Sequence, residues 1–76
     1  MKDAINHLKD HIILCGYGKV GQEVARVFKN EGVKFVIIES NTTNATRAVT
    51  EGYLCIEGDA TNDEILKQAR TENARA

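Results

Sequence analysis

The stretch Ile12-Ile13-Leu14-Cys15-Gly16-Tyr17-Gly18-Lys19-Val20-Gly21 decides the fold of this chain. A short apolar run leads straight into a G-x-G-x-x-G turn, and an amphipathic segment starts near Lys19. Glycines at this spacing occur by chance in many loops, but a strand that feeds a helix through them is typical of a dinucleotide-binding turn. We therefore predict a buried strand over residues 11–15 and a helix over residues 19–30.

Each glycine of the turn has a different expected role. Gly16 permits the tight turn, Gly18 lets a pyrophosphate approach the backbone, and Gly21 lets the helix pack closely on the strand. The phosphates are then expected on the free N–H groups at the positive end of the helix dipole. A glycine-rich turn that binds no ligand remains the alternative.

An acidic residue completes the dinucleotide pattern. The run Phe35-Val36-Ile37-Ile38 has no polar alternation, which predicts a strand over residues 34–39 that is buried on both faces. Glu39 ends this strand, where a dinucleotide-binding unit carries an acidic residue.

The whole chain alternates short apolar runs with amphipathic ones, which predicts a parallel sheet with crossover helices. We expect a short N-terminal helix ending near Asp10, a short and mobile helix over residues 41–51, a third strand over residues 53–57, and a last helix from Thr61 to Ala74. The predicted fold class is α/β: a Rossmann-like parallel sheet made of one βαβαβα half, with strand order 3-2-1, and a short N-terminal helix.

Two local patterns predict details of the helices. Thr61-Asn62-Asp63-Glu64 predicts a capping box, with Thr61 as the N-cap and Glu64 at the third helical position. The buried face of helix 19–30 is predicted from four apolar residues at helical spacing: Val20, Val24, Val27 and Phe28.

The cysteines and the sheet edge lead to further expectations. Cys15 and Cys55 lie in apolar strand runs and are expected in the core. Their strands would lie two positions apart, about 10 Å, which exceeds the roughly 7 Å limit for a disulfide. The same strand order leaves strand one as an open apolar edge, so we expect an isologous homodimer that pairs strand one with its own copy.

Composition excludes several classes of function. The chain has 10 basic and 11 acidic residues, so it offers no basic face for nucleic acid. No apolar run approaches the about 20 residues of a membrane-spanning helix, and the N-terminus lacks the apolar run of a signal peptide. We therefore expect a cytoplasmic domain with no direct insertion into the membrane. His7 and His11 are four residues apart, but the helix is expected to end between them, so we predict no metal site.

Residues 10–21, together with Gly58-Asp59-Ala60-Thr61 after the third predicted strand, resemble the N-terminal nucleotide-binding lobe of RCK/KTN domains. These domains are cytoplasmic regulators of potassium channels and transporters. The resemblance covers about residues 9–74, and the second motif is less usual among dehydrogenases. It implies a Rossmann-like fold, binding of NAD(H) or an adenine nucleotide (AMP, ADP or ATP), and assembly of homo-oligomers, as dimers or larger rings, that act on a potassium pore.

The resemblance also implies roles for single residues. The candidate nucleotide-binding residues are Gly16, Tyr17, Gly18, Lys19, Val20, Gly21, Glu39, Ser40, Asp59 and Ala60. Lys19 would face a phosphate, and Asp59 and Ala60 would lie near the adenine. Glu39 would accept hydrogen bonds from ribose hydroxyls and repel a 2′-phosphate, which favours NAD or an adenosine nucleotide over NADP. A solvated strand end remains the alternative for Glu39, and a polar loop residue remains the alternative for Asp59.

Two departures from the family pattern stand out. Ser40-Asn41 stands where the family often has a further acidic residue, and Arg70-Thr71 stands where glycine followed by an aliphatic residue is common.

The predicted function is a ligand-sensing module without catalytic residues. The alternatives are the dinucleotide-binding half of an NAD-dependent oxidoreductase, which has the same glycine turn, and a purely structural module. Hydride transfer needs an acid or base near the nicotinamide, and the histidines of this chain precede the glycine turn.

Overall fold

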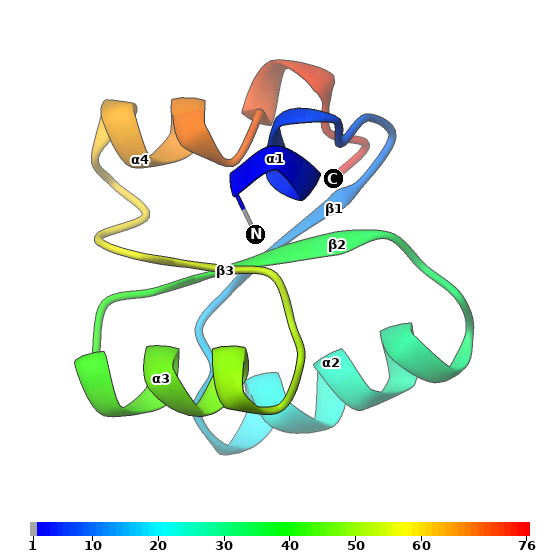
Figure 1. The fold of residues 1–76 in the computed structure, drawn as a ribbon, viewed down its shortest axis with the longest axis vertical. Coiled ribbons are helices and arrows are strands. Elements are labelled where there is room, and N and C mark those ends of the chain that lie inside the picture. Colours follow the sequence, from blue (N-terminus) through cyan, green and yellow to red (C-terminus); the bar gives the residue numbers. More distant parts are fainter. Residues whose placement is uncertain (1) are drawn as a thin grey trace.

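Three parallel strands form the centre of the fold (Figure 1). The computed structural model describes residues 2–76. β1 (Ile12–Cys15), β2 (Phe35–Glu39) and β3 (Cys55–Glu57) lie in the order β1-β2-β3. This is the predicted order 3-2-1 read from the other edge, so the predicted α/β class and strand order are confirmed.

Helices cover both faces of the sheet (Figure 1). α2 (Lys19–Asn30) and α3 (Thr42–Thr50) lie on one face, because two consecutive crossovers in the same direction place their helices on the same side. α1 (Lys2–Asn6), α4 (Asp63–Gln68) and the 3₁₀ turn η1 (Thr71–Asn73) lie on the other face. Among residues 2–76, no helix has the length and apolar character needed to cross a membrane.

The central strand β2 supplies both halves of the core. Successive side chains of a strand point to opposite faces, so Val36 and Ile38 face one layer of helices and Ile37 faces the other. The cluster on the α1 and α4 side contains Ile5, Leu8, Val36, Ile38, Ile56 and Ala69. The cluster on the α2 and α3 side contains Tyr17, Ala25, Ile37, Ala45, Ala48 and Cys55. The apolar run that predicted burial on both faces is thus confirmed.

The buried face of α2 differs from the prediction. Ala25 is fully buried, whereas Val20 is 77% exposed and Val27 is 55% exposed. The cause is the close approach of Gly21 to the carbonyl of Gly16, which turns the Gly21 and Ala25 side of the helix toward the sheet. The expectation that Val20 and Val27 are buried is therefore wrong.

The start of α4 also differs from the prediction. Asn62, not Thr61, is the N-cap, and its side chain accepts the N–H of Glu64 at 2.8 Å. Thr61 instead donates its N–H and its hydroxyl to Asp59, at 2.8 and 2.7 Å, in the loop before the helix. The predicted capping box is therefore wrong: with Asn62 as the N-cap, Ile65 is the third helical residue, and the Thr61 hydroxyl binds Asp59.

α4 ends well before Ala74. Arg70 adopts left-handed backbone angles, φ 58° and ψ 49°, and its Nε donates to the carbonyl of Leu8 at 2.8 Å. A residue in this conformation cannot continue a right-handed helix. The chain therefore turns at Arg70 and passes through η1 toward the free edge of β1.

The last residues of the chain lie beside the edge of β1 that faces away from β2 (Figure 1). The N–H of Arg75 donates to the carbonyl of His11 at 2.7 Å, and the N–H of Ile13 donates to the carbonyl of Ala76 at 3.0 Å. Both segments run in the same direction along this edge. The expectation of a bare edge on strand one is wrong for its first half.

The two cysteines lie on the two outer strands, as the strand order predicts. Cys55 is buried, and burial raises the pKa of its thiol to about 11. Cys15 is exposed, so its predicted place in the core is wrong. The reason is that Cys15 ends an edge strand, past the two hydrogen bonds that the C-terminal residues make with β1.

Candidate functional site

The predicted site residues come together at the carboxyl end of the sheet. The glycine turn follows β1, Glu39 ends β2, and Gly58 follows β3. The N–H of Gly16 donates to Ile38 at 2.8 Å, and the N–H of Gly58 donates to Glu39 at 2.9 Å, so the three segments are adjacent. The carboxyl ends of parallel strands are where ligands bind in open α/β sheets.

The glycines of the turn have different physical roles. Gly16 has a φ of +105°, which L side chains rarely adopt. A Cβ on Gly21 would stand 2.2 Å from the carbonyl oxygen of Gly16, so this contact requires glycine. Gly18 has an ordinary φ of −77°, but a Cβ there would meet no protein atom within 4 Å. The turn is thus held by Gly16 and Gly21, and Gly18 borders open space.

The N-terminus of α2 faces this open space. Gly18 is the N-cap, no side chain caps the helix, and its first turn carries no acidic residue. The first N–H groups of a helix have no intrahelical partner and lie at the positive end of its dipole. Lys19 adds an exposed cation at the same point. The arrangement is suited to an anion.

Glu39 joins the glycine turn to the loop after β2. The residue is 7% exposed, and its carboxylate accepts the N–H of Tyr17 at 2.5 Å and the N–H of Asn41 at 2.8 Å. The pKa of Glu39 lies below its usual value, chiefly because the N–H of Asn41 binds the ionised form. The N–H of Tyr17 lowers this pKa further, while burial raises it. The N–H of Ser40 and the side chain of Asn44 also favour the ionised carboxylate, so a ribose hydroxyl would share this acceptor with donors of the protein.

The buried side chain of Tyr17 attaches the glycine turn to the core on the α2 and α3 side. Its side chain is 2% exposed, its ring lies 5.7 Å from that of Tyr53, and its hydroxyl donates to Glu51 at the end of α3. Burial raises the pKa of the Tyr17 phenol, and the hydrogen bond to Glu51 raises it further. Tyr17 therefore offers the site its backbone, while its side chain belongs to the core.

The remaining predicted residues line the same edge with different exposure. Ser40 and Asp59 are exposed, and Ala60 is half-buried against the core cluster on the α4 side. The N–H and the hydroxyl of Thr61 hold the pKa of Asp59 below its usual value. An exposed, ionised Asp59 beside Ala60 is available to a base bound at this edge, and that role stays a prediction.

Sequence reasoning missed Asn41. Its N–H holds Glu39, and its side chain caps α3 by accepting the N–H of Asn44 at 2.9 Å. An asparagine between a strand and a helix is a common N-cap, and this signal was present in the sequence.

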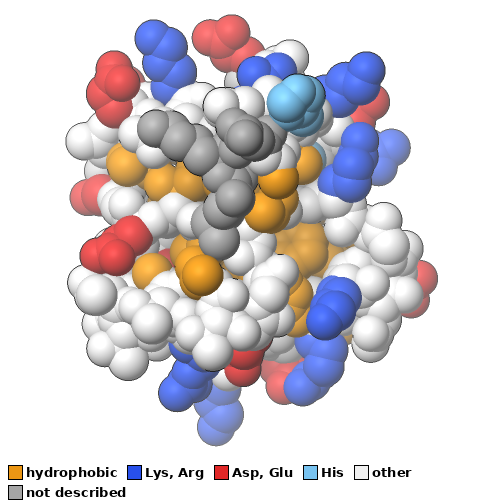
Figure 2. All heavy atoms as spheres, viewed as in Figure 1, with side chains coloured by type: hydrophobic (Ala, Val, Ile, Leu, Met, Phe, Trp, Pro, Cys, Tyr) orange, Lys and Arg blue, Asp and Glu red, His pale blue; other side chains and the backbone are white. Residues whose placement is uncertain are grey.

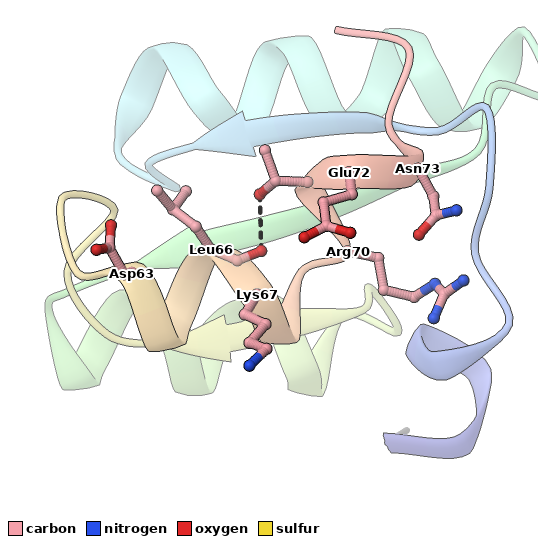
Figure 3. A pocket seen from close by; sticks show the side chains of 7 residues that line it. Asp63, Leu66, Lys67, Arg70, Glu72 and Asn73 are labelled. Atoms are coloured by element: carbon pink, nitrogen blue, oxygen red, sulfur yellow. Dashed lines mark hydrogen bonds between the residues drawn. The ribbon is translucent and has the colours of Figure 1, made fainter.

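A hollow of about 410 Å³ lies elsewhere, between α4 and η1 (Figure 3). Its charged side chains have both signs: Asp63 and Glu72 are acidic, and Lys67 and Arg70 are basic. Mixed charges at this open surface give no cradle for a phosphate. In the part of the chain that the structure describes, no group of three His, Cys, Asp or Glu side chains is placed to hold a metal ion.

The three-stranded parallel sheet and the glycine turn together define a Rossmann-type domain. The profile of the TrkA-N domain matches residues 12–76, so the chain belongs to the TrkA-N domain family. The predicted resemblance to the RCK/KTN lobe is thereby confirmed.

Two of the relatives carry names of potassium-transport proteins. The chain is 43% identical, over 99% of its length, to Potassium channel protein 1 of Methanocaldococcus jannaschii, and covers 23% of that protein. It is 41% identical, over 87% of its length, to the Trk system potassium uptake protein TrkA homolog of Pyrococcus horikoshii, and covers 29% of it. The crystal structure of the TrkA-N domain of inner membrane protein ybaL from Escherichia coli matches with a TM-score of 0.84 at 29% identity, over 90% of this chain and 50% of that one.

Proposed function

We propose that this chain is a regulatory module that binds NAD(H) or an adenine nucleotide at the glycine turn and controls a potassium channel or transporter from the cytoplasmic side. The observation that carries the proposal is the uncapped N-terminus of α2 beside Gly18, which opens onto space free of protein atoms next to the ionised Glu39. In the same proposal the module works in a homo-oligomer, as a dimer or a larger ring, and catalyses no reaction.

The chemistry of the ligand follows from the two sides of the site. A pyrophosphate or phosphate on the N-terminus of α2 gains the unpaired N–H groups and the charge of Lys19. A ribose beside Glu39 finds an acceptor for its 2′- and 3′-hydroxyls, and a 2′-phosphate would meet a buried negative charge. NAD(H) and the adenine nucleotides therefore fit better than NADP.

The potassium channel or transporter is inferred from the names of two relatives. Their names describe a potassium channel protein and a Trk system potassium uptake protein, and this chain spans about a quarter of the length of each. A module of this size that changes its packing on binding a ligand is suited to passing that change to a larger partner.

The oxidoreductase alternative lacks a histidine at the glycine turn that could act as an acid or base beside a nicotinamide. His11 is fully buried, and its Nε2–H donates to the carbonyl of Ala69 at 2.7 Å, at the opposite end of β1. The described residues around the glycine turn include no histidine. This supports a sensor over an enzyme.

The test is calorimetric titration of the chain with NAD, ADP and ATP. We expect weak binding, because three strands supply one half of a dinucleotide crevice. Gly18→Val should weaken binding by at least about tenfold, since its methyl groups would occupy the pyrophosphate position. Val27→Ala, on the exposed side of the same helix, is the matched control and should bind as the parent does.

Two outcomes would count against the proposal. A folded Gly18→Val variant that binds as tightly as the parent removes the glycine turn from the site. Transfer of hydride between NADH and a deuterated NAD analogue, catalysed by the chain, would favour the oxidoreductase.

A further inference from the structure

A groove at the opposite end of the sheet from the glycine turn has the properties of a second binding site. It has a volume of about 360 Å³ and lies where β2 and β3 begin, between the end of α1 and the end of α2. Figure 2 shows hydrophobic atoms at the surface near the middle of this view, with Lys and Arg side chains to their right and Asp and Glu side chains to their left. The volume is within the range of about 300–1,000 Å³ that small-molecule sites occupy.

Aromatic rings form one wall of the groove. Phe35 and Tyr53 both line it, and their ring centroids lie 5.5 Å apart with the planes tilted by 49°. Each ring also packs on a second aromatic ring. The ring centroids of Phe28 and Phe35 lie 5.4 Å apart, and those of Tyr17 and Tyr53 lie 5.7 Å apart. Both lining rings are half-buried, so they are fixed in place and still present apolar surface to the groove.

The charges of the groove have one sign. Lys29 and Lys34 line it, both are exposed, and the Nζ of Lys29 lies 5.8 Å from the centre of the Tyr53 ring. The other lining residues are apolar, aromatic or glycine, so the described wall carries no acidic side chain. A flat apolar surface with two cations at its rim is complementary to an anion that has an apolar body.

We propose that this groove binds a small organic anion with a flat, apolar body of about two rings. The rings of Phe35 and Tyr53 contact the apolar body, and Lys29 and Lys34 hold the carboxylate or sulfonate at the rim. The groove is a separate site from the glycine turn, which lies at the other end of the strands.

The experiment compares two probes with the same rings. Anilinonaphthalene sulfonate carries a negative charge, and N-phenyl-1-naphthylamine lacks it. Fluorescence titration of the 76-residue chain should give saturable binding of the sulfonate with one site, and weaker binding of the amine by about fivefold, as expected for charge pairs at a surface. Amide resonances of Gly32, Phe35, Gly52 and Tyr53 should shift on titration.

Variants then separate the charge from the fold. Lys29→Gln combined with Lys34→Gln should abolish the preference for the sulfonate and leave the affinity for the amine unchanged. Lys67→Gln, on α4 at the other face of the sheet, is the matched control and should keep the preference.

Four results would overturn the proposal. The first is absence of saturable binding, and the second is equal affinity for both probes in the parent chain. The third is a set of shifts at residues 16–21 with displacement by NAD, because that result would assign the dye to the glycine turn. Binding that appears only with self-association of the chain would assign the groove to a second copy and also exclude the small anion.

Discussion

At Gly21 the structure leaves no room for a side chain. A Cβ would stand 2.2 Å from the carbonyl oxygen of Gly16, and a backbone atom in a tight turn cannot move aside as a flexible side chain can. The same contact brings α2 close to β1 and sets which side of the helix meets the sheet. One residue thus determines both the turn and the packing of the element that follows.

We expect Gly21→Ala to destabilise the fold by roughly 1–3 kcal/mol, even though alanine gains about 1 kcal/mol of helix propensity over glycine. Urea unfolding measures the change. Gly18→Ser is the control, because its Cβ meets no protein atom and serine is a good N-cap, so its stability should stay within about 0.5 kcal/mol of the parent. Equal losses in both variants would contradict this account.

Glu39 makes the stability of the fold depend on pH. Its pKa in the folded state lies below its usual value, chiefly because the Asn41 N–H binds the ionised form. A depressed pKa gives stability that is present above the unfolded value, near 4.5, and is lost as the pH falls through the folded value. We expect Glu39→Gln to be less stable than the parent at pH 7 by roughly 1.5–3 kcal/mol, the range for hydrogen bonds to a charged group.

The measurement is urea unfolding of both proteins from pH 7 down to pH 3. The difference between them should shrink as the pH falls below about 4.5, since the protonated Glu39 of the parent and the amide of the variant are then alike in charge. A difference that stays constant over this range would show that the Glu39 carboxylate does not hold the turn through its charge.

At the scale of elements, Arg70 connects the end of α4 to the segment that follows α1. Its Nε donates to the carbonyl of Leu8 at 2.8 Å while its backbone stays in the left-handed region. We expect Arg70→Ala to lose this hydrogen bond and keep the backbone strain, whereas Arg70→Gly loses the bond and relieves the strain. Arg70→Ala should therefore be less stable than Arg70→Gly by about 1 kcal/mol.

Hydrogen exchange tests whether the hydrogen bond from Arg70 to Leu8 stabilises the segment around the end of α1. Amides of residues 5–8 should exchange faster in both variants, because the carbonyl of Leu8 loses the Arg70 donor in each. Unchanged exchange in this segment would mean that α1 is held by its apolar contacts alone.

At the scale of the whole molecule, the C-terminal residues protect the edge of the sheet. Residues 74–76 place two hydrogen bonds along the first half of β1, where an unpaired edge strand is a template for another chain. We expect removal of residues 74–76 to increase self-association relative to the intact chain. Sedimentation equilibrium of both proteins over the same concentrations measures the effect.

The outcome bears directly on the predicted homodimer through strand one. If the shortened chain associates more strongly, the tail and a second copy compete for one edge. If both chains show the same association state, any oligomer of this domain uses another surface.

Local sequence patterns determined the α/β class, the order of elements and the placement of the candidate site. The spacing of Gly16, Gly18 and Gly21 specifies a strand, a turn and a helix, and the run before Glu39 specifies a strand buried on both faces. These features have a short range, because backbone conformation and the periodicity of apolar residues are set by neighbours in the chain. The edge where the site residues meet then follows from the parallel sheet itself.

Tertiary structure alone decided which side of α2 is buried, where α4 ends and what lies beside β1. Val20 and Ala25 are both apolar and near in sequence, yet the close contact of Gly21 with Gly16 exposes one and buries the other. The left-handed turn at Arg70 is coupled to a carbonyl 62 residues away. Such features depend on tertiary contacts between elements that are distant in sequence. A pattern of neighbouring residues does not specify these contacts.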